Sequence, residues 1–369
     1  MPELRFAGFS GEWMEKKIKN ISTINSGKDY KHLQSGNIPV YGTGGLMTHV
    51  NKYLSEKDSI GIGRKGTINR PYILNHPFWT VDTLFFTTPN IETNLYFLYG
   101  IYQNINWLKY DESSGLPSLS KKNIENLVVS VPNIKEQEKI GDLFSKIDQL
   151  IESQQELVDQ TMAFKKSMLQ KMFPKKDSFV PEFRFYSFKE HWNSVKIGNF
   201  LEEYKIKTKT EDEYDMLSST NTGVIYRDRN LGVKSNVGYK VLDMHDLVLS
   251  PQNLWLGNIN INELKKGIVS PSYYTFKIRK LDLEFLKPQL KTKRMLENYK
   301  NASMQGASVV RRNLEINEFY DIKLKIPSPE EQEKIGNFFK NLDEKIAREE
   351  KLLDAYKDMK KSLLQKMFV

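Results

Sequence analysis

The fold is decided by a stretch that occurs twice: PNIKEQEKIGDLFSKIDQLIESQQELVDQTMAFKKSMLQKMF at residues 132–173 and PSPEEQEKIGNFFKNLDEKIAREEKLLDAYKDMKKSLLQKMF at residues 327–368. The copies lie 195 positions apart, and 20 of their 42 positions are identical without a gap. A match of this quality indicates an internal duplication, so the chain contains one structural unit twice.

Each copy is predicted to form one long helix. Apolar residues recur at steps of mostly three and four, close to the repeat of a coiled coil. Such a stripe needs a partner, and the other copy is the obvious one. We expect antiparallel pairing, which relates the units by a pseudo-twofold axis; parallel pairing is the alternative. The predicted pairing positions are Ile140, Phe144, Ile147 and Ile151 in the first copy and Ile335, Phe339, Leu342 and Ile346 in the second.

The starts of these helices carry capping signals. Ser328 with Glu331 forms the pattern of a capping box, and Asn133 with Glu136 is a weaker version of it. The acidic residues within the helices are expected on solvated faces, or as a docking surface for a partner: Glu136, Glu138, Asp148 and Asp343.

A second repeat extends the duplication to the whole chain. PELRFAGFSGEW at residues 2–13 returns as PEFRFYSFKEHW at 181–192, with six of twelve positions identical. The regions between the repeats differ from each other, and both alternate short β-branched and aromatic runs with Gly, Asn, Ser and Pro, a pattern typical of strands and loops. Each also carries one amphipathic helical segment, at 93–109 and 283–299. The predicted class is α+β, with two mixed α/β domains at 1–132 and 177–327, each followed by a long helix at 133–176 and 328–369.

Composition narrows the function classes. The 369 residues include no Cys, which excludes disulfides, thiolate metal sites and Cys nucleophiles and fits a cytoplasmic protein. No apolar run is long enough to span a membrane. The net charge of +9 makes a polyanionic partner plausible.

Basic and amide side chains beside Gly and aromatic positions are the candidate nucleic-acid contacts. Arg and Lys can pair with guanine edges and Asn and Gln with adenine, while other Lys side chains hold phosphates. Two different basic domains held apart by a rod suit the two halves of a duplex DNA site. The candidates are Thr43, Arg64, Lys65, Arg70, Lys121 and Lys122 in the first unit and Arg227, Arg229, Gln252, Asn253, Asn258, Lys265, Arg311 and Arg312 in the second.

The two EQEKIG…KKSxLQKMF helices, each after a domain that opens with PELRF…W or PEFRF…W, resemble the specificity subunit of type I restriction–modification systems. IPVYGTGGL, IGRKGTI and FWTVDTLFF within 38–86, and GIVSPSYYTFKI at 267–278, are similar to target-recognition domains of that family. The resemblance implies that each domain reads one half of a bipartite DNA site. It also implies that the helices set the spacing and dock two modification (methyltransferase) subunits, to which restriction subunits join. S-adenosylmethionine, ATP and Mg are then expected on those partners, and no cofactor on this chain.

The sequence contains no convincing catalytic or cofactor-binding motif. Gly61-x-Gly63-x-x-Gly66 matches a dinucleotide fingerprint, but no helical run follows it. The five His show no paired metal spacing, and the chain lacks a G-x-S-x-G elbow and the N-P-P-[FYW] tetrapeptide of adenine methyltransferases. The sequence therefore predicts a non-catalytic recognition subunit. A coiled-coil scaffold without a DNA role is the alternative.

Overall fold

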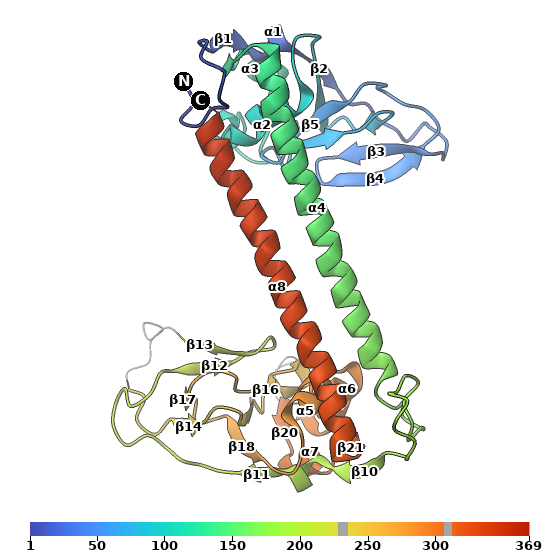
Figure 1. Cartoon of the computed structure of the whole chain (residues 1–369), viewed down its shortest axis with the longest axis vertical. Helices are drawn as coiled ribbons and strands as arrows, with labels where there is room; N and C mark the ends of the chain where they lie inside the picture. Colours follow the sequence, from blue (N-terminus) through green and yellow to red (C-terminus); the bar gives the residue numbers. More distant parts are fainter. Residues whose placement is uncertain (228–234, 306–311, 369) are drawn as a thin grey trace. The chain divides into compact units, whose positions relative to one another are not determined.

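The computed structural model describes residues 1–227, 235–305 and 312–368 (Figure 1). The chain folds into two compact units. Each unit contains one domain together with one end of each long helix. Unit 1 comprises Met1–Glu156 with Glu350–Val369, and unit 2 comprises Leu157–Glu349. The candidate sites Arg229 and Arg311 lie outside the described residues.

The long helices are α4 (Ile134–Lys171) and α8 (Pro329–Met367), and they are continuous as predicted. In unit 1 the start of α4 meets the end of α8, where the rings of Phe144 and Phe368 lie 5.5 Å apart. In unit 2 the end of α4 meets the start of α8, where the rings of Phe173 and Phe339 stack at 5.8 Å. Contacts within each unit therefore confirm the antiparallel pairing and exclude the parallel alternative.

Two equivalent ion pairs fix the register of this helix pair. Lys360 of α8 pairs with Asp148 of α4 in unit 1. Lys165 of α4 pairs with Asp343 of α8 in unit 2. Each Lys and each Asp lies 195 positions from its counterpart, so the pairs are related by the duplication. The Asp148 and Asp343 side chains remain 29% and 38% exposed, in line with the predicted solvated faces, and antiparallel packing also brings each of them against a Lys of the other helix.

The stripe residues divide between the domain cores and the helix pair. Ile140 and Phe144 join the core of unit 1 together with Met367 and Phe368. Ile335 and Phe339 join the core of unit 2 together with Met168 and Met172. Ile147 and Ile346 are buried, and Ile151 and Leu342 are half-buried. Each domain therefore packs on the beginning of its own helix and on the end of the other.

The first domain is built on a four-stranded antiparallel sheet in the order β2-β8-β5-β6. A smaller sheet, β4-β3-β7, lies beside it, and β1 pairs with β9. The elements are β1 (Met14–Lys17), α1 (Ile18–Ile21), β2 (Ser22–Ser26), β3 (Ile38–Gly42), β4 (Gly45–Val50), β5 (Ser59–Gly63), β6 (Tyr72–Leu74), β7 (Trp79–Thr80), β8 (Leu84–Pro89), α2 (Leu95–Asn104), η1 (Trp107–Tyr110), α3 (Lys121–Asn126) and β9 (Val128–Val131).

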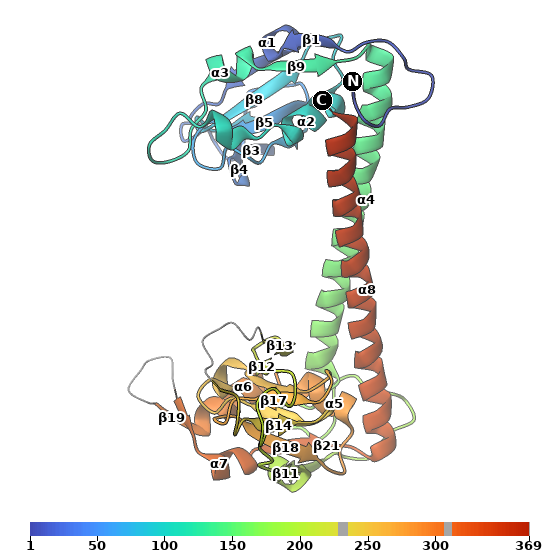
Figure 2. The ribbon, with the colours of Figure 1, turned by 90° about the vertical axis from the view of Figure 1, so that its left-hand side faces the viewer.

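The second domain repeats this topology. Its four-stranded sheet has the order β11-β18-β15-β16, and β10 pairs with β21 as β1 does with β9. In place of a three-stranded sheet, unit 2 has two two-stranded sheets, the hairpin β12–β13 and the pair β14–β17, which are labelled in Figure 2. The elements are β10 (Asn193–Lys196), η2 (Ile197–Phe200), β11 (Leu201–Glu203), β12 (Leu217–Ser219), β13 (Val224–Tyr226), β14 (Lys240–Leu242), β15 (Leu247–Leu249), η3 (Leu254–Leu256), β16 (Ile259–Ile261), β17 (Gly267–Val269), β18 (Tyr274–Ile278), α5 (Leu283–Gln289), α6 (Lys293–Asn301), β19 (Ser303–Gln305), β20 (Arg312–Leu314), α7 (Ile316–Tyr320) and β21 (Lys323–Ile326).

The amphipathic segments are broken where the sequence predicted continuous helices. The segment 93–109 becomes α2 and the short helix η1. The segment 283–299 becomes α5 and α6, because Pro288 lies near the end of α5 and Thr292 caps a new helix by accepting a hydrogen bond from the backbone N–H of Met295 at 3.4 Å.

The repeated EQ motif attaches each helix to its own domain. Glu136 is fully buried and takes a bidentate ion pair from Arg5, with N–O distances of 2.6 and 2.7 Å. Glu331 takes the same pair from Arg184, at 2.7 Å for both bonds. Asn133 and Ser328 do cap the backbone N–H groups of Glu136 and Glu331, at 3.1 and 3.4 Å. The carboxylates, however, neither complete a capping box nor face solvent, because they neutralise an Arg of the N-terminal repeat.

Gln and Gly of the same motif seat a second helix against the first. The side-chain oxygens of Gln137 and Gln332 accept the backbone N–H groups of Asn94 and Asp282, the capping residues of α2 and α5, at 3.1 and 3.2 Å. Gly141 is required by close approach, since a Cβ there would lie 2.2 Å from Oδ1 of Asn94. The equivalent distance at Gly336 would be 2.7 Å. The motif is therefore a structural joint present once in each unit.

Candidate nucleic-acid interface

The loop between β5 and β6 positions Arg64 and Lys65 at the surface of unit 1. The five residues of β5 are buried, and the chain turns sharply after Gly63, where a Cβ would lie 2.0 Å from the carbonyl oxygen of Thr67. The loop is held on two sides. The N–H of Arg64 donates to the carbonyl oxygen of Thr83 at 2.8 Å, and the N–H of Gly66 donates to that of Pro117 at 2.8 Å. Both basic side chains are exposed on this fixed loop.

Arg64, Lys65 and Lys121 line one hollow of about 330 Å³. The Arg64 guanidinium lies 5.7 Å above the ring of Phe85, which is the floor of the hollow, and donates to the carbonyl oxygen of Asp82 at 3.5 Å. Lys121 begins α3 and pairs with Glu125 at 3.6 Å. The hollow is completed by Ser26, Ser118, Leu119 and Ser120. Cations beside hydroxyl groups on a firm backbone can hold a phosphate or a guanine edge.

The other candidates of unit 1 lie around this hollow or apart from it. Thr43, in the turn between β3 and β4, approaches the same loop, since a Cβ on Gly66 would lie 3.9 Å from its hydroxyl oxygen. Arg70 and Lys122 are exposed and do not line the hollow. The structure thus brings together Thr43, Arg64, Lys65 and Lys121.

The equivalent loop of unit 2, between β15 and β16, carries Gln252 and Asn253. Gln252 is exposed, and its carbonyl oxygen accepts the N–H of Arg312 at 3.3 Å. In unit 1 the bond of the same direction runs from the N–H of Leu119 to the carbonyl oxygen of Arg64 at 2.9 Å. Both domains therefore brace the same loop on the segment that precedes their last short helix.

Two candidates of unit 2 are engaged inside the domain instead. Asn258 is 9% exposed; its amide oxygen accepts the Ser219 hydroxyl at 2.6 Å, and its amide nitrogen donates to the Ser219 carbonyl at 2.8 Å. The Arg312 guanidinium donates to the carbonyl oxygens of Lys300 and Ser303, at 3.3 and 2.7 Å, at the end of α6. These polar groups stabilise the loop framework. Arg227 is half-buried and Lys265 is exposed.

Beside Lys265, an ionic network occupies its neighbour Lys266. Lys277 bridges Asp243 and Asp246, with N–O distances of 2.8 Å to each, and Lys266 reaches Asp243 at 3.3 Å. The hydrogen bond from Lys277 holds the pKa of Asp243 below its ordinary value. The pKa of Lys266 is raised by its bond to Asp243. This network reflects pairing between β15, β18 and their loops, which no local pattern in the sequence reveals.

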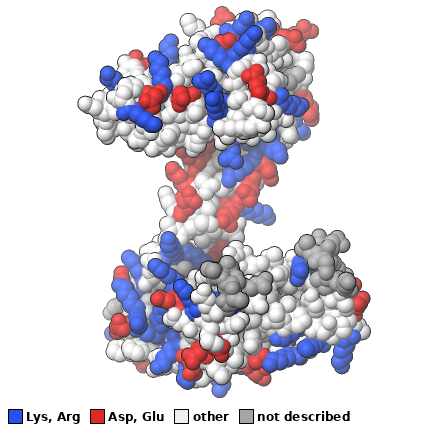
Figure 3. Space-filling view, turned by 180° about the vertical axis from the view of Figure 1, so that it is seen from behind, with Lys and Arg blue, Asp and Glu red and all other residues white. Residues whose placement is uncertain are grey.

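Surface charge by itself does not mark the interface. On the face drawn in Figure 3, Lys and Arg side chains are intermingled with Asp and Glu. Sequence reasoning missed Ser26, Phe85, Ser118 and Ser120, which come from separate segments and meet Arg64 only in the fold. Among the described residues, no cluster of three or more His, Asp or Glu could hold a metal ion. No helix in the described part of the chain is both long and apolar enough to cross a membrane.

Comparison with known proteins defines the class. Residues 10–160 match the model of the type I restriction modification DNA specificity domain. In this matched part and in its duplicated fold, the chain is similar to the specificity subunits of type I restriction–modification systems, which confirms the predicted resemblance. Specificity subunits are non-catalytic, and catalysis resides in their partner subunits.

Individual relatives agree with this class. The chain is 24% identical over 306 residues to the type I restriction enzyme MjaVIII specificity subunit of Methanocaldococcus jannaschii, covering 74% of this chain and 69% of the relative. The S subunit of a type I restriction–modification system from M. genitalium has the same fold, with a TM-score of 0.71, 14% identity and coverage of 100% and 99% of the two chains. A chain from a structural study of complex assembly and conformational transition of the type I R-M system matches with a TM-score of 0.53, at 12% identity over 97% of each chain.

Proposed function

We propose that each domain reads one half of an asymmetric bipartite DNA site. The main support for this proposal is that the two domains share one sheet topology but differ in one pair of equivalent loops. We call these loops, between β5 and β6 in unit 1 and between β15 and β16 in unit 2, the reading loops. The sheets β2-β8-β5-β6 and β11-β18-β15-β16 have the same order. Their equivalent loops present Arg64 and Lys65 in unit 1 but Gln252 and Asn253 in unit 2. Arg and Lys suit guanine and Gln and Asn suit adenine, so the two domains would read different sequences.

The helix pair would set the spacing between the halves and dock the modification subunits. Its two copies are identical at 20 of 42 positions, and the ion pairs Lys165–Asp343 and Lys360–Asp148 hold it in one register. A repeated surface would bind two copies of the same partner, which supports two modification subunits, with restriction subunits completing the nuclease. In this proposal S-adenosylmethionine, ATP and Mg bind to those partners.

Mapping of methylated bases in cells that carry this chain with its modification subunit tests the proposal. We expect one asymmetric site with two separated halves. Exchanging residues 14–131 for those of another specificity subunit should change only one half. Continuous sites, or a change in both halves, would contradict the assignment of one half to each domain.

Duplex binding as a function of salt tests the reading loop. Lys65→Ala should weaken binding and reduce the salt slope by about one, as expected for one lost phosphate contact. Lys52→Ala, an exposed Lys outside the hollow, is the matched control. Salt-independent binding by the wild-type complex would instead favour a scaffold without a DNA role.

The ruler role has its own test. Asp148 and Lys165 in α4 correspond to Asp343 and Lys360 in α8, so one heptad inserted between them in both helices keeps both ion pairs. Seven residues add about 10 Å of helix, equivalent to about three base pairs. The recognised spacer should lengthen accordingly while both half-site sequences stay the same. An unchanged spacer would overturn the ruler.

A further inference from the structure

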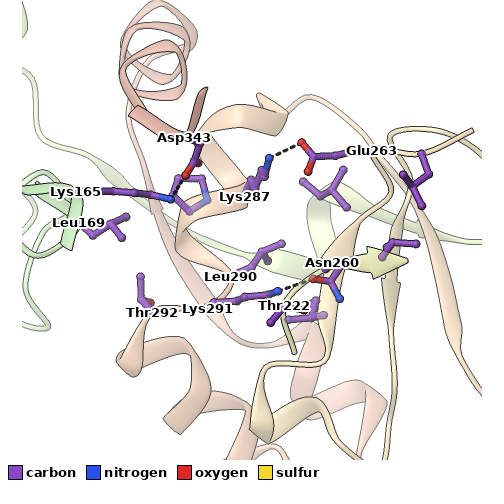
Figure 4. A pocket seen from close by; sticks show the side chains of 16 residues that line it. Lys165, Leu169, Thr222, Asn260, Glu263, Lys287, Leu290, Lys291, Thr292 and Asp343 are labelled. Atoms are coloured by element: carbon purple, nitrogen blue, oxygen red, sulfur yellow. Dashed lines mark hydrogen bonds and ion pairs between the residues drawn. The ribbon is translucent and has the colours of Figure 1, made fainter. Parts of the chain in front are cut away.

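A basic furrow in unit 2 lies between the end of α4 and the first turn of α6, and nothing in the proposed function uses it. Its volume is about 630 Å³. Six cations line it: Lys166, Lys175, Lys291, Lys293, Arg294 and Lys325. None of its described lining residues is acidic. It shares Leu169, Lys291 and Thr292 with the neighbouring cavity shown in Figure 4, where both acidic residues are already paired, Asp343 with Lys165 and Glu263 with Lys287.

Three of the cations are held in place by carbonyl oxygens and amides instead of carboxylates. Lys325 is 7% exposed and donates to the carbonyl oxygens of Lys175, Lys176 and Ser178. Arg294 donates to the carbonyl oxygen of Pro174 at 3.3 Å. Lys291 donates to Oδ1 of Asn260 at 2.6 Å, as Figure 4 shows.

Burial leaves these positive charges without full compensation. It lowers the pKa of Lys291, Arg294 and Lys325, because desolvation disfavours the charged form. The nearest acids lie outside the furrow. Asp177 acts on Lys325, and Glu182 pairs with Lys175 at 3.2 Å. An anion that binds in the furrow would therefore be attracted by these three cations, which the domain pairs with carbonyl and amide oxygens instead of carboxylates.

The floor of the furrow is apolar. Leu169 near the end of α4 and Phe173 just after it are half-buried there, beside the buried Met295 and Leu324. A phosphate backbone has nothing to place on such a floor, whereas an aliphatic or aromatic side chain does. Three of the cations are exposed: Lys166 on α4 and Lys293 on α6 stand at the rim, and Lys175, in the segment after α4, is the one that pairs with Glu182.

The furrow is also separate from the reading loop. Arg312, which supports that loop, binds the carbonyl oxygens at the C-terminal end of α6. The furrow lies at the N-terminal end of the same helix, which is about 13 Å long. The positive end of the helix dipole adds to the attraction for a carboxylate.

We infer that the basic furrow binds an acidic segment of a partner protein, with carboxylates on the rim cations and one apolar side chain on the floor. Unit 1 has no equivalent of α6, because η1 stands in its place after α2. The furrow therefore takes one such segment per chain, unlike the repeated helix surfaces. The inference does not depend on the proposed function.

A labelled peptide of glutamates around one central phenylalanine, titrated with the full-length chain, is the probe. The wild type should bind it, and Lys166→Glu with Lys293→Glu should weaken binding by about tenfold or more. Both side chains are exposed. Lys300→Glu, on the same helix outside the furrow, is the matched control and should stay within about twofold of the wild type.

The alternative occupants give different results. The phenylalanine-to-alanine peptide should bind more weakly than the parent. Equal binding by the two peptides, or by the wild type and the double variant, would overturn the inference. A third result would assign the furrow to phosphate groups instead. In that case the wild type would bind inorganic phosphate or duplex DNA but not the peptide, and the double variant would lose the phosphate or DNA binding.

Discussion

Replacing Arg184 with alanine should destabilise unit 2 by about 3–5 kcal/mol, the range expected when a buried ion pair loses one partner. The Glu331 side chain is 1% exposed, and Arg184 donates both hydrogen bonds that reach its carboxylate among the described residues, at 2.7 Å each. Without Arg184, this carboxylate would be buried and unpaired.

The duplication supplies an internal comparison. In unit 1, Glu136 also accepts the indole N–H of Trp13 at 3.4 Å. The corresponding indole N–H in unit 2, that of Trp192, is buried and has no hydrogen-bond partner among the described residues. Arg5→Ala should therefore destabilise unit 1 less than Arg184→Ala destabilises unit 2.

Hydrogen–deuterium exchange through a guanidinium series is the assay, because it follows the two units separately. Arg184→Met combined with Glu331→Met should recover most of the lost stability, since it leaves no unpaired charge. The reasoning would be refuted if Arg184→Ala cost less than about 1 kcal/mol, or if the double variant were as unstable as the single one.

Four further perturbations follow from the same contacts. Gly336→Ala should destabilise α8 by about 1–2 kcal/mol although alanine is the better helix former, because its Cβ would meet the cap of α5; a gain in thermal stability would contradict this. Phe368→Ala should cost about 3–5 kcal/mol in unit 1, measured by denaturant unfolding, because the ring packs on the rings of α2 and α4, and an unchanged midpoint would mean that the end of α8 is dispensable. Lys165→Asp should destabilise the helix pair by about 1 kcal/mol, and adding Asp343→Lys should restore it; failure of this rescue would show that the ion pair does not set the register. Asp243→Asn should lower stability at neutral pH, and since the folded pKa of Asp243 lies below its unfolded value, the difference from the wild type should shrink as the pH falls below about 4; a constant difference down to pH 2 would exclude a role for the carboxylate charge.

Local sequence patterns were sufficient to predict the long helices and the internal duplication. Their apolar repeat and capping residues predicted the starts of α4 and α8 to within one residue and their ends to within five, because a helix is held by contacts within four positions. The same repeat did not reveal that Ile140 and Phe144 belong to a domain core, since a stripe has the same spacing whether it meets a helix or a sheet. The break between α5 and α6 was missed although Pro288 and the capping residue Thr292 are local signals for it.

The candidate site shows the same division. Residue type and loop position identified Arg64, Lys65 and Gln252 as exposed, yet Asn258 is committed to Ser219, on a strand that is remote in the sequence. The residues that complete the hollow around Arg64 come from three separate segments.

By itself, the sequence determined that this protein is built twice from one plan, with long amphipathic helices and unlike domains, because those properties are written in repeats and periods. Only the tertiary structure decided that Glu136 and Glu331 meet an Arg far away in the chain, that the two Lys–Asp pairs cross between antiparallel helices, and that six cations gather around one furrow. The physical reason is that a charge takes the partner that packing brings within hydrogen-bonding distance, and distance in space is not encoded in the spacing of residues along the chain.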